Sequence, residues 1–130
     1  MKIVLDTNVF VAAGFNPRSH SAAILRAVED GDHTFIWDEP TRAETRKILE
    51  KIPPLSWERF EYLFQAENEF IGDVHPERYT QVSDYDDRKF AALASAAEAV
   101  LVSNDDDLLS VREQLDITVL TTGEFLAAYR

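Results

Sequence analysis

Two short apolar runs rich in β-branched residues are each followed by an acidic side chain. Residues 2–5 (Lys-Ile-Val-Leu) lead directly into Asp6, and residues 100–102 (Val-Leu-Val) lead shortly afterwards to Asp105. Runs of this length and composition are typical of buried strands. In a parallel α/β sheet the carboxyl ends of the strands open onto one crevice. The pattern therefore predicts a sheet that carries carboxylates at one end.

Helical segments alternate with strand-like runs along the whole chain, and this alternation indicates a parallel sheet with helices on both faces. We expect one domain over residues 1–130, an α/β fold of the three-layer α/β/α sandwich type, with a mainly parallel sheet of about five strands. The expected strands are 2–5, 34–37, 71–75, 100–102 and 117–120, and the expected helices are 9–13, 19–29, 39–51, 56–70, 84–97, 108–115 and 122–129.

The composition favours a cytoplasmic protein. The sequence contains no cysteine, which excludes disulfides, thiolate zinc sites and cysteine nucleophiles. It also contains neither a long apolar run nor a signal-peptide pattern. We therefore expect no membrane partner and no export.

The net charge of −11, from 24 acids against 13 Lys and Arg, argues against general nucleic-acid binding. Phosphate recognition normally relies on cationic groups. The objection weakens if several acids converge on divalent ions, because each ion cancels two negative charges where a phosphate must approach. An acidic surface equally suits a basic protein partner. Charge alone leaves both possibilities open.

Asp6 and Asn8 begin the segment that follows the first expected strand. An acid in this position is commonly a helix N-cap or a turn residue. At the mouth of a parallel sheet it could instead bind a metal ion, with Asn8 orienting a water molecule or capping the helix. The sequence leaves both roles open.

Glu44 lies on the expected helix 39–51, at the edge of its apolar face. Most helical glutamates are solvated. An acid at the core boundary can, however, point into a crevice. Arg42 and Arg46 could then contact phosphate groups, although pairing with a glutamate of the same helix is the simpler role for at least one of them.

The acidic run 84–87 is expected to start a helix, and capping together with the helix dipole explains two of its three carboxylates. Asp87 is the best candidate ligand because it lies one turn before Phe90, on the face expected to pack against the sheet.

Three adjacent carboxylates at 105–107 exceed the needs of one helix cap. Asp105 should lie nearest the crevice, with Asp107 as a second or water-mediated ligand. Ser103 could hydrogen-bond these carboxylates, or simply form a turn.

Taken in order, these segments resemble the PIN-domain family, and most of all the bacterial and archaeal PIN proteins that are toxin components of type II toxin–antitoxin pairs. The resemblance extends to the closing Thr122-Gly123-Glu124-Phe125-Leu126. The segments that carry it are Leu5-Asp6-Thr7-Asn8-Val9, Glu44, Asp84-Tyr85-Asp86-Asp87-Arg88-Lys89-Phe90 and Ser103-Asn104-Asp105-Asp106-Asp107-Leu108-Leu109.

The resemblance implies an α/β/α sandwich in which the first and fourth strands are neighbours, and a Mg²⁺- or Mn²⁺-dependent endoribonuclease acting on RNA. It also implies a homodimer inhibited by a small antitoxin protein. The catalytic acids would be Asp6, Glu44, Asp87 and Asp105, with Glu39 as the fallback for Glu44. Asp6, Asp87, Asp105 and Asp107 would hold metal, and Asn8, Ser103, Arg42 and Arg46 would support the site or bind substrate.

In the expected mechanism, one or two metal ions activate water against an RNA phosphodiester. Two alternatives stay open. A phosphatase-like phosphate-transfer protein would need a second aspartate where Asn8 stands, and a receiver domain would need an acceptor aspartate and a lysine that are not evident. A non-catalytic module would use the same acids to chelate metal or to meet a basic partner.

Overall fold

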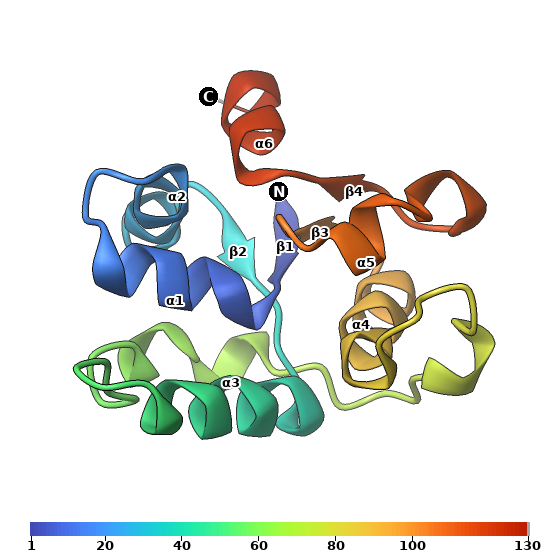
Figure 1. Ribbon diagram of the computed structural model, residues 1–130, viewed down its shortest axis with the longest axis horizontal. Coiled ribbons are helices and arrows are strands. Elements are labelled where there is room, and N and C mark those ends of the chain that lie inside the picture. The colour runs from blue at the N-terminus through green and yellow to red at the C-terminus, as the bar shows by residue number, and fades with distance from the viewer. Residues whose placement is uncertain (130) are drawn as a thin grey trace.

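The computed structural model describes residues 1–129 and forms a three-layer α/β/α sandwich around a parallel sheet (Figure 1). The strands β1 (Lys2–Leu5), β2 (Thr34–Phe35), β3 (Val100–Val102) and β4 (Val119–Leu120) pair in the order β2-β1-β3-β4. The expected fold class is confirmed, with four strands in place of about five. The helices are α1 (Thr7–Phe15), α2 (His20–Glu29), α3 (Glu39–Lys51), α4 (Arg88–Ala97), α5 (Asp106–Leu109) and α6 (Thr122–Ala128).

Both faces of the sheet are apolar, because the strands contain consecutive apolar residues and successive side chains of a strand point to opposite sides. Ile3 and Leu5 of β1 pack into one core with residues of α1, α2, α3 and α6. Val4, between them, packs into the second core with Leu101 and the apolar face of α4. The two cores are the reason that the sheet lies as the middle layer.

The pairing of β1 with β3 brings the two predicted acidic strand ends together. Leu5 lies opposite Val102 in the parallel register, and the Asp6 amide donates to the Val102 carbonyl at 3.1 Å. The resemblance implied that these two strands are neighbours, and the sheet confirms it. Asp6 is thereby set beside residues 103–107.

The strand expected over residues 71–75 is wrong. This segment is irregular, and the nearest pairing is an isolated bridge between Trp37 and Glu69. Ile71, which should have been buried in a strand, is 79% exposed. With Gly72 and Asp73 following it, the run offers no continuous apolar face for a sheet to bury.

The helix expected over residues 56–70 is also wrong, because two short 3₁₀ turns, Glu61–Leu63 and Ala66–Asn68, occupy it. In the structure, Trp57 and Phe60 of this segment insert into the core. Aromatic residues are only moderate helix formers, so tertiary burial decides the conformation. Tyr62 is the one large aromatic side chain of this segment that is more than half exposed.

Smaller corrections concern helix ends. The helix expected over 19–29 begins one residue later, at His20, because Ser19 is its N-cap and accepts from the Ala22 amide. Thr121, not Thr122, caps α6. The helix expected over 108–115 is α5 followed by a separate 3₁₀ turn, Arg112–Gln114. None of the helices within residues 1–129 has the length and apolar run that a membrane crossing requires.

Candidate metal centre

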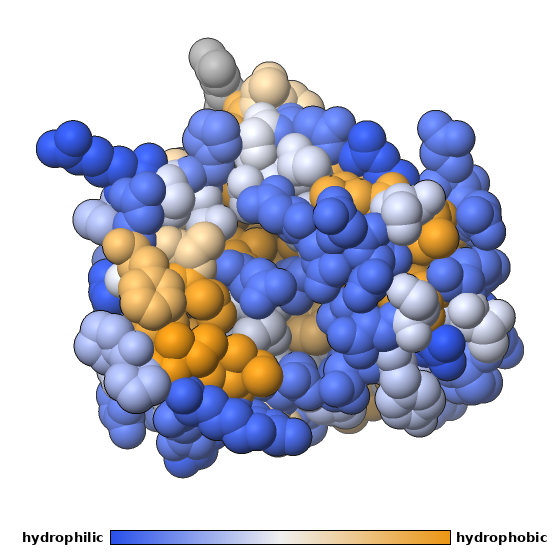
Figure 2. Space-filling model, viewed as in Figure 1, coloured by the Kyte–Doolittle hydropathy of each residue, from blue (hydrophilic) through white to orange (hydrophobic). Residues whose placement is uncertain are grey.

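Six carboxylates from four separate segments line one pocket of about 210 Å³ at the carboxyl ends of β1 and β3. Asp6 follows β1, Glu44 comes from α3, and Asp105 precedes α5. Asp84, Asp86 and Asp87 come from the segment before α4. The four acids expected from the sequence to act together are therefore brought together. Over α4 and α5 the surface is largely hydrophilic (Figure 2).

Asp6 serves both as a helix cap and as a wall of the pocket. Its Oδ1 accepts from the Asn8 amide at 3.5 Å, and its Oδ2 accepts from the Ser103 hydroxyl at 2.6 Å. The side chain is only 2% exposed. Burial raises the pKa of Asp6, the hydrogen bond from Ser103 opposes that shift, and the negative charge of Asp105 adds to it.

Ser103 joins the two strand ends through one hydroxyl group. Its Oγ donates to Asp6 and accepts from the Asp105 amide at 3.0 Å. Asp105 in turn caps α5, since its Oδ1 accepts from the Asp107 amide at 2.9 Å. The sequence left Ser103 between a turn role and a carboxylate contact, and both are present.

Asp87 carries the clearest electrostatic strain of the site. Its side chain is 8% exposed, and among the described residues its buried Oδ2 has no hydrogen-bond partner. Burial, and then the charges of Asp6 and Asp105, raise the pKa of Asp87 to about 8. A buried carboxylate oxygen without a donor is costly. A divalent cation would satisfy this oxygen and offset the like charges, so the residues fit a hard metal ion.

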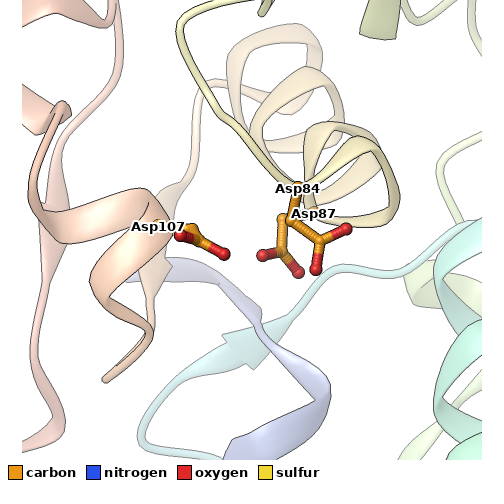
Figure 3. Close-up of side chains that lie close together, drawn as sticks. All are labelled: Asp84, Asp87 and Asp107. Atoms are coloured by element: carbon orange, nitrogen blue, oxygen red, sulfur yellow. The ribbon is translucent and has the colours of Figure 1, made fainter.

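Asp84, Asp87 and Asp107 form the tightest group of potential ligands. Each offers a carboxylate oxygen, and these three oxygens lie within 4.8 Å of one another. Ligands on opposite sides of a hard cation are separated by about 4–5 Å. Figure 3 shows Asp84 and Asp87, from the segment before α4, facing Asp107 of α5 across a gap. Asp107 lies where an auxiliary ligand was expected.

Asp84 lines the pocket, although the sequence analysis did not name it as a candidate site residue. Capping and the helix dipole were expected to explain two of the three carboxylates in the run 84–87, and Asp84 Oδ1 does accept from the Asp86 amide at 2.9 Å. The cap holds the carboxylate in the pocket rather than away from it. Its spacing of three residues before Asp87 is the signal that was available, because residues three apart in a helical turn share a face.

Glu44 is held on the pocket wall by an ion pair with Lys89, whose Nζ lies 3.1 Å from Glu44 Oε1. Both side chains are largely buried. The helix that carries Glu44, α3, is tied to the start of α1 by a contact between the buried hydroxyls of Thr45 and Thr7, 2.9 Å apart. Glu39, the fallback for Glu44, is exposed in the first turn of α3. Lys89 was not expected to take part in the site.

Arg42 and Arg46 pack elsewhere. Their guanidinium carbons lie 5.0 and 5.9 Å from the centre of the Trp57 ring, and Arg46 also pairs with Glu50 at 3.4 Å. The residues that line the acidic pocket include Asn8 but neither arginine. A phosphate contact by Arg42 or Arg46 is therefore a prediction that would need these side chains to move.

Comparison with known proteins gives a family and a fold. Residues 2–107 match the family model described as "PIN domain", and no curated protein matches. FitAB bound to an IR36 DNA fragment is similar at 22% identity over 92% of this chain and 94% of that chain, with a TM-score of 0.61. VapBC2 from Rickettsia felis, bound to a DNA fragment from its promoter, is similar at 17% identity over 93% and 98%, with a TM-score of 0.59. FitAcB from Neisseria gonorrhoeae is similar at 20% identity over 93% and 98%, with a TM-score of 0.58.

Proposed function

The chain belongs to the PIN domain family, and on that premise we propose that it is a Mg²⁺- or Mn²⁺-dependent endoribonuclease, the toxin of a toxin–antitoxin pair. The single observation that carries the proposal is Asp87. Within residues 1–129 its buried Oδ2 has no hydrogen-bond partner, and Asp87 shares a pocket with Asp6, Glu44 and Asp105. Such a concentration of negative charge is best explained by a cation-binding role.

The metal would be held by Asp87 with Asp84 and Asp107, and by Asp6 and Asp105 on the strand ends. A divalent ion bound there would lower the pKa of a water molecule and offset the charge of the phosphate. The chain's own part is to fix the ligands before the substrate arrives, because preorganised ligands need no reorientation during the reaction.

Two residue pairs supply that rigidity. Ser103 holds one oxygen of Asp6 in place, and Lys89 holds Oε1 of Glu44. In the proposed reaction Glu44 Oε2 accepts a proton from the attacking water, since Lys89 engages the other oxygen of the same carboxylate. Proton transfer to a positioned carboxylate is a common contribution to hydrolysis.

A basic partner protein would account for the strongly negative charge of this chain, which RNA cleavage alone does not explain. Two of the similar solved structures, FitAB and VapBC2, are bound to DNA fragments. With a net charge of −11, this chain is itself a poor ligand for DNA. We propose a basic, small antitoxin that covers the acidic pocket, a homodimer of this chain, and a cytoplasmic location.

Metal-dependent cleavage of RNA tests the proposal. The wild-type protein is expected to cut single-stranded RNA in Mn²⁺ and to stop in EDTA, and Asp105→Asn should reduce the rate at least about 100-fold. Asp32→Asn, which changes an exposed acid on the loop after α2, is the matched control. Stabilisation by Mn²⁺ without any cleavage would instead support a non-catalytic module. Hydrolysis of small phosphate monoesters in place of RNA would support a phosphatase.

A further inference from the structure

Tyr85 is a large aromatic side chain left on the surface beside the acidic pocket. It is 75% exposed, although most of the large apolar side chains of this protein are buried. It lies in the 3₁₀ turn Tyr85–Asp87, directly between Asp84 and Asp86, and both of these neighbours line the pocket. The backbone of Tyr85 therefore lies beside the pocket, although Tyr85 is not one of the residues that line it.

Arg88 supports this ring without burying it. Its guanidinium carbon lies 5.5 Å from the centre of the Tyr85 ring, within the range of a cation–π contact. Arg88 is itself fixed, because its Nε donates to the Val82 carbonyl at 2.9 Å. A ring that is packed on an anchored guanidinium and still largely exposed can receive a second planar group.

The surroundings of the ring select the kind of group. Asp84 and Asp86 repel a phosphate in the absence of metal, but they do not repel an uncharged nucleobase. Stacking of a base on an aromatic side chain is insensitive to sequence and does not depend on a basic surface. It also requires an unpaired base, since the bases of a duplex are already stacked.

We infer that Tyr85 is the platform on which an unpaired nucleobase adjacent to the scissile phosphate stacks. The inference rests on the proposed ribonuclease function. It gives an acidic protein a source of substrate affinity that does not require cationic side chains.

Binding of a single-stranded RNA oligonucleotide tests the inference, measured by fluorescence anisotropy in Mn²⁺. An Asp105→Asn background prevents cleavage during the measurement. Tyr85→Ala should weaken binding about 5- to 100-fold, Tyr85→Trp should retain it, and Tyr85→Leu should not restore it. Tyr62→Ala is the matched control, because Tyr62 is 56% exposed and bonds to Glu29 instead.

A second probe assigns the lost affinity to stacking. An oligonucleotide whose bases are replaced by abasic sites should bind the protein with Tyr85 as weakly as intact RNA binds the Tyr85→Ala protein. The Tyr85→Ala substitution should cause no further loss of affinity for the abasic oligonucleotide. Equal affinity of the Tyr85 and Tyr85→Ala proteins for intact RNA overturns the inference, and so does a loss confined to binding of a protein partner. Wild-type protein that shows no metal-dependent cleavage overturns the proposed function itself, which separates the two failures.

Discussion

The Ser103 hydroxyl donates a 2.6 Å hydrogen bond to Oδ2 of Asp6, across 97 positions of sequence. Both side chains are buried, at 0% and 2% exposure. The contact exists because β1 and β3 are adjacent and parallel, so their carboxyl ends finish at the same place. Through this contact the pairing of the two strands fixes the position of the Asp6 carboxylate in the pocket.

Removal of this hydroxyl should destabilise the metal-free protein. In Ser103→Ala a buried carboxylate loses its strongest donor, which should cost about 1–3 kcal/mol of unfolding free energy. The same change raises the pKa of Asp6 further, because the Ser103 hydrogen bond lowers it. Urea unfolding in EDTA measures the loss. Ser110→Ala, at an exposed position, should stay within about 0.5 kcal/mol, and equal stability of the two variants would contradict the account.

Stability of the metal-free protein should fall as the pH rises. The ordinary pKa of an Asp carboxyl is 3.8, and that of Asp87 is raised to about 8 in the folded protein. Between these values the folded state holds a proton that the unfolded state has released, so the unfolding free energy decreases with pH and levels off above about 8. Unfolding in urea and EDTA at pH 5.5, 7 and 8.5 is the measurement.

Asp87→Asn isolates the source of that dependence. The amide cannot ionise, so the variant should be more stable than wild type at high pH and its profile should be flatter. Part of the dependence of the unfolding free energy on pH should remain in this variant, because the pKa of Asp6 is raised as well. Asp32→Asn should leave the profile unchanged. A wild-type stability that increased from pH 5.5 to 8.5 would refute the assignment.

Lys89 should restrain metal affinity while it stabilises the metal-free protein. In Lys89→Met, Glu44 loses its partner and the acidic pocket loses a nearby positive charge. We expect a loss of about 1 kcal/mol in EDTA and a larger gain in melting temperature on adding Mn²⁺ than wild type shows. Lys47→Met removes the same charge from an exposed position of α3 and should change neither quantity. A smaller Mn²⁺ response in Lys89→Met than in wild type would argue against this role.

The strand-end acids could be predicted from sequence because short-range rules determine them. Apolar runs of three or four residues define β1 and β3, and parallel pairing then forces Asp6 and Asp105 together. Glu44 could be placed by helical phase alone, since a residue at the edge of an apolar face points to the rim of the core.

Other parts of the site depend on contacts that no local pattern encodes. Lys89 meets Glu44 across 45 positions, and nothing near either residue announces the pair. Asp84 caps the turn that follows it, and because this local role explained the residue, there was no reason in the sequence to place it in the pocket. Residues 56–70 have helical spacing, but burial of Trp57 and Phe60 in the core overrides it.

The chemistry of the RNA ends gives the most direct test that this carboxylate cluster works through a metal-activated water. Attack by water on the phosphorus with departure of the 3′ oxygen leaves a 5′-phosphate and a 3′-hydroxyl. We predict these ends, formed in Mn²⁺ by the wild-type protein and absent both in EDTA and with Asp105→Asn. Cleavage that persists in EDTA and leaves 2′,3′-cyclic phosphates would contradict the account.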